Sequence, residues 1–410
     1  MIQELTLPEI ATADRHSMKR GPFGGALKKD IFVDEGYVVY EQQHAIYKRF
    51  NDVRYYIDES KYKELIAFKV EEGDLIISCS GTIGKIAEVP KNFKPGIINQ
   101  ALLKLTLDQS KVLNKYFIYL FEGEEIQNQL FNLSHGTGLK NFPPMSVVKS
   151  IKFPLPPLEQ QKKIAAILDA ADTYRQKTKA LIEKYDELIQ SLFLDMFGDL
   201  SLKNTKWDTL KIREVIIEYK SGASIKPAEF TQNGFPVLHK GAIKTNGGIL
   251  VDSKKKAFVS LDTCVKYKKS IVDKKYLVVT LRDLVPTGPS IGLMSHLKHF
   301  EIDQYILAQG AYGLLLNEKL VNPAYMVHWS NSPIYRGELS KYWVGSTQIH
   351  LRSSMFFDLD MPVPNIKLQN KFAGSVQAIE TQKTQAQASL VQAEDLFNSL
   401  LQRAFKGELV

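Results

Sequence analysis

Two long stretches of the chain have the hydrophobic pattern of amphipathic helices. Residues 158–197 contain neither glycine nor proline, and Pro156 and Pro157 stand directly before them, where a missing backbone N–H costs a helix little. At ~1.5 Å per residue, this stretch predicts a helix ~60 Å long. A second helix is predicted after Pro364, with Asn365 as its N-cap residue.

Both stretches carry an apolar stripe with the seven-residue spacing of a coiled coil. In the first stretch, eight of the ten a and d positions are apolar or aromatic, whereas the second stripe is patchier. A helix of ~60 Å is longer than a domain of ~150 residues. We therefore expect the two helices to pack together rather than each on its own domain alone. The residues predicted to serve helix packing or a partner are Ile164, Ile167, Tyr174, Leu181, Tyr185, Leu188, Leu192, Phe372, Ile379, Leu396 and Leu400.

The chain contains one long unit twice. Residues 153–165 align with residues 361–373, and this alignment continues without a gap to Leu192 and Leu400. Weaker matches keep the same order, such as residues 81–84 with 289–292 and residues 99–101 with 308–310. The pattern indicates a duplicated scaffold that carries two dissimilar inserts.

The blocks between the helices have a mixed α and β character. Short runs rich in β-branched residues, such as 74–79, 102–107 and 276–281, predict strands separated by glycine-containing turns. We therefore predict an α+β fold with globular domains over 1–152 and 201–360. The long helices are predicted over 153–200 and 361–410.

Charge is distributed unevenly along the chain. The formal net charge is +8, and the excess falls within residues 201–360, where lysines cluster. Such clustering suits a polyanion such as nucleic acid, because each lysine near a phosphate releases a condensed counterion. A solvated lysine-rich face explains the same pattern, and charge alone leaves both interpretations open.

The chain has no sequence signal for a membrane or for a metal. No apolar stretch approaches the ~20 residues of a spanning helix, so no membrane partner is expected. Cys79 and Cys264 stand far apart without further Cys or His at ligand spacing, which predicts two core cysteines, a cytoplasmic location and no metal site.

Motifs of DNA-modifying enzymes are absent. The segment Gly81–Ile86 has the lysine of a phosphate-binding loop, but it lacks the earlier glycine and the Ser or Thr after the lysine. Neither Pro-Pro segment has the flanking residues with which an amino-methyltransferase holds an extruded base. We therefore expect no catalytic residue and no cofactor in this chain.

The sequence resembles the specificity subunit of a type I restriction-modification enzyme. The phrases that close the two repeats carry the resemblance: Pro154-Leu-Pro-Pro-Leu-Glu-Gln-Gln161 and Ser399-Leu-Leu-Gln-Arg-Ala-Phe-Lys-Gly-Glu-Leu409. Two features depart from it. Residues 1–35 lack a Trp-containing opening like that at Trp207, which predicts a divergent or shortened start. The second helix start lacks the second Pro and the Glu, which predicts a weaker contact there.

The resemblance implies a fold and a set of partners. It implies two similar target-recognition domains, each reading one half of a bipartite site in double-stranded DNA. Two long antiparallel helices would form a coiled-coil spacer between these domains, with a pseudo-two-fold internal repeat. Two methyltransferase subunits would bring S-adenosylmethionine and modify adenine N6. Motor-nuclease subunits would bring ATP and magnesium.

Candidate DNA contacts lie mainly in two polar loops that the repeat pairs. Asn, Gln, His and Arg side chains can read base edges, and Lys mostly holds phosphates; a tight turn that closes each domain is the alternative. The loop candidates are His135, Thr137, Lys140, Asn141, Ser346, Gln348, His350 and Arg352. Further candidates are Lys28, Lys29, Arg49, Arg54, Lys240, Lys244, Asn246, Lys254, Lys255 and Lys256.

Two other functions compete with DNA reading. A stand-alone DNA methyltransferase or nuclease would bind its cofactor or metal without partners, and the missing motifs count against it. A coiled-coil scaffold without a DNA role would have no salt-dependent affinity for DNA.

Overall fold

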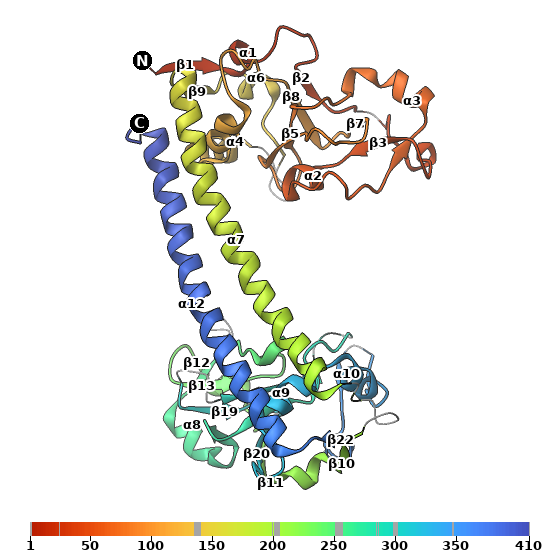
Figure 1. The fold of residues 1–410 in the computed structure, drawn as a ribbon, viewed down its shortest axis with the longest axis vertical. Coiled ribbons are helices and arrows are strands. Elements are labelled where there is room, and N and C mark those ends of the chain that lie inside the picture. The colour runs from red at the N-terminus through yellow and green to blue at the C-terminus, as the bar shows by residue number, and fades with distance from the viewer. Residues whose placement is uncertain are drawn as a thin grey trace. The chain divides into compact units, whose positions relative to one another are not determined.

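The chain folds into two compact units. The computed structural model describes residues 2–23, 25–134, 141–198, 200, 206–250, 257–283, 285, 287–297, 302–346 and 348–409. Unit 1 comprises Met1–Thr178 and Ser389–Val410, and unit 2 comprises Lys179–Ala388. Each unit therefore contains a part of both long helices, α7 (Leu158–Phe197) and α12 (Ile366–Phe405) (Figure 1).

Unit 1 combines short strands with short helices. Its strands are β1 (Gln3–Thr6), β2 (Met18–Arg20), β3 (Tyr37–Tyr40), β4 (Tyr56–Ile57), β5 (Leu75–Ser78), β6 (Ile86–Glu88), β7 (Gly96–Ile98), β8 (Leu102–Leu105) and β9 (Lys152–Leu155). Its helices before α7 are α1 (Leu7–Ile10), α2 (Gln42–Tyr47), α3 (Glu59–Glu64), α4 (Asn114–Glu122), α5 (Glu124–Asn132) and α6 (Met145–Val148), with 3-10 turns η1 (Lys29–Ile31) and η2 (Ile66–Phe68). The strands form sheets in the orders β2-β8-β5-β6, β4-β3-β7 and β1-β9.

Unit 2 repeats this plan. Its strands are β10 (Asp208–Lys211), β11 (Ile216–Ser221), β12 (Phe230–Thr231), β13 (Phe235–Leu238), β14 (Phe258–Val259), β15 (Ile271–Asp273), β16 (Leu277–Thr280), β17 (Arg282–Asp283), β18 (Met294–His296), β19 (Gln304–Leu307), β20 (Ala311–Leu316), β21 (Ile349–His350) and β22 (Asp360–Val363). Its helices before α12 are α8 (Leu261–Lys266), α9 (Pro323–Asn331), α10 (Pro333–Ser340) and α11 (Ser353–Phe357), with 3-10 turns η3 (Ile212–Val215), η4 (Pro227–Glu229), η5 (Thr245–Gly247) and η6 (Lys268–Ser270). The sheet orders are β11-β20-β16-β18, β12-β14-β13-β19-β15, β10-β22 and β17-β21.

The predicted internal repeat is confirmed at the level of strand pairing. The order β11-β20-β16-β18 repeats β2-β8-β5-β6, and β13 pairs parallel with β19 as β3 does with β7. The opening strand is also repeated, because β1 pairs with β9 just as β10 pairs with β22. The first unit therefore starts with the same ribbon as the second, without a tryptophan.

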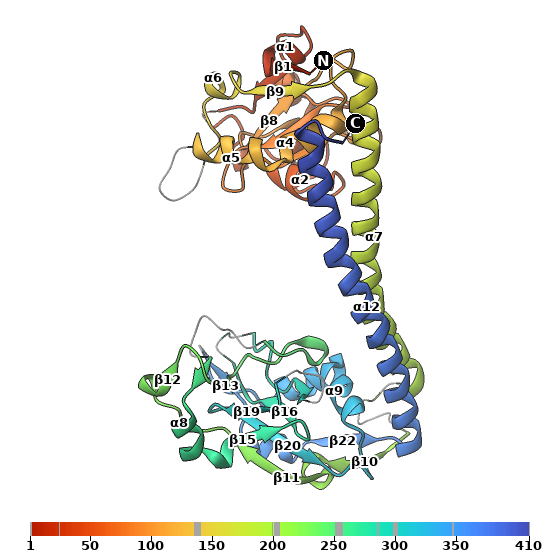
Figure 2. The same cartoon turned by 90° about the vertical axis from the view of Figure 1, so that its left-hand side faces the viewer.

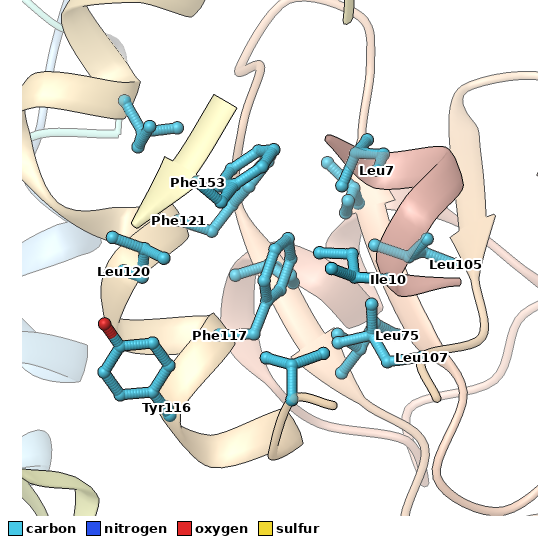
Figure 3. Packing of buried hydrophobic residues seen from close by; sticks show 14 of the residues in the cluster. Leu7, Ile10, Leu75, Leu105, Leu107, Tyr116, Phe117, Leu120, Phe121 and Phe153 are labelled. Atoms are coloured by element: carbon cyan, nitrogen blue, oxygen red, sulfur yellow. The ribbon is translucent and has the colours of Figure 1, made fainter. Parts of the chain in front are cut away.

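Aromatic side chains fill the core of unit 1 between α4 and its sheets. Phe117 and Phe121 of α4 face Phe153 of β9, and the rings of Phe117 and Phe153 lie 5.2 Å apart (Figure 3). On the other side they meet Leu7 of α1 and Leu75 of β5, both fully buried. Because buried aromatic rings remove ~150–250 Å² each from water, this cluster contributes strongly to the stability of the unit.

The long helices are part of both cores. In unit 2, Phe193 and Phe197 of α7 pack on Phe372 of α12, with ring centroids 5.4 and 5.3 Å apart. In unit 1, the Arg175 guanidinium lies over the Phe397 ring, 4.4 Å from its centroid. The predicted packing of the two helices is therefore confirmed within each unit, and they run antiparallel (Figure 2).

The predicted packing register is wrong at the d positions. The side chains of Ile167, Tyr174, Leu181, Leu188 and Leu396 are 37–52% exposed. The buried positions of α7 instead include Ile164, Leu168, Ala171, Thr178 and Ile189, and those of α12 include Phe372, Val376, Ala386, Ala393 and Phe397. Each helix touches both its partner and a globular core, so its buried face spans the a and e positions rather than a and d.

One buried glutamine holds the start of each long helix. Gln161 is fully buried; its Oε1 accepts from the Leu113 backbone N–H (2.9 Å), and its Nε2 donates to the carbonyls of Lys111 (3.0 Å) and Pro156 (2.9 Å). These bonds satisfy backbone groups at the start of α4 and of α7, which would otherwise be buried without partners.

Gln369 makes the equivalent three bonds in unit 2. Its Oε1 accepts from Asn322 N–H (2.8 Å), and its Nε2 donates to the carbonyls of Leu320 (3.1 Å) and Pro364 (2.6 Å). A weaker contact is predicted at this helix start, and the same three hydrogen bonds form there although the second Pro and the Glu are missing. Asn365 accepts from Lys367 N–H (2.9 Å), which confirms it as the N-cap.

Replacing Gln161 by Leu should lower the free energy of unfolding by roughly 2–4 kcal/mol, because three buried backbone groups lose their partners. Urea denaturation of the full chain measures this change. The matched control is Gln160→Leu on the neighbouring position, where we expect less than about 0.5 kcal/mol. Equal effects of the two variants would contradict the role of the Gln161 amide.

Unit 2 also contains a half-buried histidine, His328 of α9, which packs against the two long helices. The His328 ring lies 5.4 Å from that of Phe372 and 6.5 Å from that of Phe193. Burial lowers the pKa of His328 to about 4, although Asp186 nearby favours the charged form. Asp186 itself is paired with Lys383, with 2.6 Å between carboxylate and ammonium. His328 is therefore neutral at pH 7.

This histidine should make unit 2 sensitive to acid. Its folded-state pKa lies below the ordinary ~6.5, so the unfolded chain takes up the proton first and stability falls as the pH drops from ~6.5 towards 4. Between pH 7 and pH 5 we expect the native chain to lose about 2 kcal/mol more than a His328→Phe variant. Urea titrations at both pH values measure the difference. Parallel losses would show that His328 does not contribute.

Candidate nucleic-acid interface

One end of the four-stranded sheet is built in the same way in both units. The chain leaves β2 at Gly21 and passes the carbonyl of Asn99; it leaves β11 at Gly222 and passes the carbonyl of Ala308. A Cβ atom at Gly21 would lie 1.8 Å from the Asn99 oxygen, and one at Gly222 would lie 1.9 Å from the Ala308 oxygen. Only glycine allows this approach, which brings the turns before β8 and β20 to the sheet end.

The two polar loops that the repeat pairs both reach this end. Asn141 forms a β-bridge with Ser80, directly after β5, whereas His350 of β21 pairs with Arg282 of β17, directly after β16. The next residue is anchored identically, because Phe142 N–H donates to the Cys79 carbonyl and Leu351 N–H to the Leu281 carbonyl. The two loops therefore occupy equivalent places.

The loop candidates of unit 2 are accessible and two of the predicted residues meet. The side chains of Ser346, Gln348, His350 and Arg352 are exposed. Lys240 Nζ donates to Gln348 Oε1 (3.4 Å), although the two residues come from separate segments. Gly345, with φ 108°, makes the loop a tight turn as well. The loop is thus both a tight turn and an exposed polar surface. DNA contact by these residues stays a prediction.

Several candidates lie where the structure gives no description. His135, Thr137 and Lys140 of the first loop lie outside the described residues, as do Lys254, Lys255 and Lys256. The side chain of Asn246, in η5, is not described either. Asn141, the last residue of the first loop, is described and exposed.

The remaining basic candidates differ in whether their charged groups already have a partner within the protein. Lys28 and Lys29 are exposed at the start of η1, and Arg49 is exposed with Asp52 4.0 Å away. Lys244 Nζ donates to the Gly241 carbonyl (2.9 Å). Arg54 donates to both carboxylate oxygens of Glu41, at 2.9 and 3.0 Å, so its guanidinium is already held by a bidentate salt bridge.

Part of the lysine cluster of unit 2 is neutralised locally. Lys266 pairs with Glu229, and Lys274 pairs with Asp303 at 2.7 Å. The hydrogen bond from Lys266 lowers the pKa of Glu229 to about 2. The positive charge counted along the sequence is therefore less continuous on the folded surface.

Sequence reasoning missed Arg282. This residue is exposed and pairs directly with the predicted contact residue His350. The equivalent position in unit 1 is Ser80, so the repeat offers no common residue type that would draw attention to it. Its position directly after the predicted strand at residues 276–281 was the available signal.

Neither a metal-ligand cluster nor an exposed thiol occurs among the described residues. These residues contain no group of three or more His, Cys, Asp or Glu side chains that could hold a metal ion. Both cysteines are buried as predicted, and burial raises the pKa of the Cys79 thiol to about 12. Among the described helices, none is long and apolar enough to cross a membrane.

A cavity of about 1250 Å³ in unit 1 lies between α4, the long helices and the loop after α2. Arg49 lines it, together with charge pairs such as Lys115 with Asp169 (2.7 Å) and Arg175 with Asp172 (2.5 Å). Its walls alternate in sign, which suits a protein surface better than a phosphate backbone.

Both halves of the chain match one family. The sequence profile of the Type I restriction modification DNA specificity domain matches residues 24–184 and 204–390, so the chain belongs to this family. The predicted membership is confirmed. The two matches also agree with the two structural repeats.

Individual relatives carry the same description. The chain is 25% identical over 333 residues to the type I restriction enzyme MjaVIII specificity subunit of Methanocaldococcus jannaschii, covering 78% of this chain and 74% of that protein. It is 21% identical over 365 residues to the EcoKI specificity subunit of Escherichia coli K12, covering 83% and 76%.

Solved structures share the fold. The S subunit of a type I restriction-modification system from M. genitalium superposes with a TM-score of 0.54 at 18% identity, over 99% of this chain and 96% of that one. A chain from a study of complex assembly in the type I R-M system gives a TM-score of 0.59 at 16% identity, over 100% and 98%. The predicted fold class, two similar α+β domains with long helices, is confirmed.

Substituting Gly222 by Ala should distort the sheet end of unit 2, since the new Cβ would strike the Ala308 carbonyl. We expect a loss of roughly 2–4 kcal/mol in the free energy of unfolding, typical of forced overpacking against backbone. Gly337→Ala in α10 is the control, because a Cβ there meets open space; it should be neutral or stabilise by up to ~1 kcal/mol. Equal stability of both variants would contradict the close approach.

Proposed function

We propose that this chain is the DNA-reading subunit of a type I restriction-modification complex, with each unit binding one half of a bipartite site. The observation that carries this proposal is the combination of a repeated framework with different side chains at the equivalent loops. Asn141 and Ser80 in unit 1 stand where unit 2 has His350 and Arg282. Two equivalent readers with different side chains match a site made of two different half-sequences.

The proposal assigns catalysis to partner subunits. Two methyltransferase subunits would bind S-adenosylmethionine and methylate adenine, and motor-nuclease subunits would bind ATP and magnesium. The long helices would act as the spacer that sets the gap between half-sites. The complex would work on host DNA in the cytoplasm. The relatives are named as specificity subunits, which supports this division of labour.

Exposed apolar side chains on α7 are candidate contacts for those partners. In unit 1 these are Ile167 and Tyr174, and in unit 2 they are Leu181 and Leu188, each 37–52% exposed. They were predicted to pack between the helices or against a partner, and only the second role remains for them. Exposed apolar side chains at regular intervals along one helix offer a surface that a partner could cover.

The test is modified-base sequencing of a methylation-free host that carries this chain, a cognate methyltransferase subunit, or both. Only the combination should give a split motif of two short half-sites around a fixed gap. Methylation by this chain alone would instead support a stand-alone methyltransferase. No methylation in any combination, with both proteins folded and assembled, would favour the scaffold.

DNA binding by the assembled complex should weaken steeply with salt. If six to ten phosphates are contacted, affinity should fall roughly 10³- to 10⁵-fold between 50 and 200 mM salt. Fluorescence anisotropy with a duplex of the sequenced motif measures this slope. A flat salt dependence would contradict phosphate contacts.

A further inference from the structure

Arg282 and His350 present their side chains on one surface of unit 2. They are directly paired residues of the antiparallel strands β17 and β21, and both are exposed. Side chains of directly opposite residues project to the same face, with Cβ atoms ~4.5–5.5 Å apart. The neighbours Asp283 and Ile349 are buried, as the alternation along a strand requires.

The stem of Arg282 is oriented by the turn beside it. Gly310 has φ 96°, and a Cβ atom there would lie 2.9–3.1 Å from Cβ, Cγ and Cδ of Arg282. The arginine therefore rests on the glycine backbone. Behind it, the Asp283 carboxylate accepts from Ser290 N–H (2.9 Å) and Ser290 Oγ (2.6 Å), which fixes the backbone of the strand. A pre-oriented side chain loses less entropy when it binds.

The guanidinium of Arg282 is not held by an acid, in contrast to several other basic groups of the two units. Arg54 is paired with Glu41, Lys266 with Glu229, and Lys274 with Asp303. Within the part of the chain that the structure describes, the Arg282 guanidinium has no carboxylate at ion-pairing distance. An exposed arginine that is held by packing and not by an acid keeps its fork of donors available for a ligand.

Unit 1 has short polar residues in the same two places. Ser80 and Asn141 form the equivalent bridge, and the equivalent of Gly310 is Ala101, which pairs with Cys79 through backbone hydrogen bonding. The turn residue and the bridge residue thus vary together. In unit 2 the small Gly310 accompanies the long Arg282, and in unit 1 the larger Ala101 accompanies the short Ser80. The framework is kept while the exposed chemistry changes.

Adjacent strands lie ~4.8 Å apart, more than the ~3.4 Å rise between base pairs, and the ~12 Å major groove admits a two-stranded ribbon. Arginine binds guanine O6 and N7 with two hydrogen bonds, and asparagine binds adenine N6 and N7 in the same way. We infer that Arg282 reads a guanine in the half-site bound by unit 2, with His350 beside it, and that Asn141 reads an adenine in the other half-site. The inference rests on the proposed function.

The experiment uses the complete complex of this chain with its methyltransferase subunits. The motif is first determined with the native chain, and then with Arg282→Ala and Asn141→Ala. Arg282→Ala should make one G·C position degenerate in one half-site and leave the other half-site unchanged, and Asn141→Ala should do the reverse at an A·T position. In anisotropy at fixed salt, the preference for the cognate base over its replacement should fall roughly 10- to 100-fold.

Lys274→Ala is the matched control, because it removes one positive charge from unit 2 at a residue already paired with Asp303. Its motif and base preference should equal those of the native complex. If Arg282→Ala keeps the native motif, or weakens cognate and replaced duplexes equally, base reading by Arg282 is refuted although the bipartite motif stands. If the native complex itself gives no split motif, the proposed function fails instead. Thermal melting of each variant complex confirms that it is folded.

Discussion

Each long helix depends on one buried amide at its first turn. Gln161 and Gln369 bond backbone groups of two different segments at once, so the start of α7 is tied to the start of α4, and α12 to α9. Since buried backbone groups must find partners, this tie fixes the angle between the long helix and the domain helix. The aromatic residues of α4 and α9 are thereby aimed into their cores, and the sheets that carry the loops pack against them.

The sequence predicted the long helices well and their packing face poorly. The bounds of α7 and the Asn365 cap follow from local rules about proline and side-chain acceptors, which operate within one turn. The a and d register of Tyr174 and Leu188 failed, because a heptad assumes one neighbouring helix whereas these helices also border a globular core. The importance of Gln369 could not be read from the altered phrase around it, since its partners at 320 and 322 lie far away in the sequence.

The sequence predicted where the candidate interface lies, but it did not predict which residues belong to it. The order of the repeat marks located the two loops, and strand pairing places Asn141 and His350 equivalently. The sequence did not identify Arg282, because its position depends on a strand pair that joins distant segments. Its counterpart Ser80 also has a different side chain. Selecting basic residues from the sequence also included residues that are already paired. Arg54 was a candidate DNA contact, yet Glu41 in the same unit holds it in two hydrogen bonds.

During synthesis the core of unit 2 can be completed before that of unit 1, although unit 1 begins first along the chain. Unit 2 is one contiguous segment, Lys179–Ala388, whereas unit 1 also needs Ser389–Val410. Phe397 and Ala404 of that last segment are buried in the same cluster as Ile164 and Leu168. A nascent chain therefore exposes part of the unit 1 core until the end of α12 leaves the ribosome, after unit 2 has all its residues. During that interval the unfinished face is open to chaperones or to another copy of the chain.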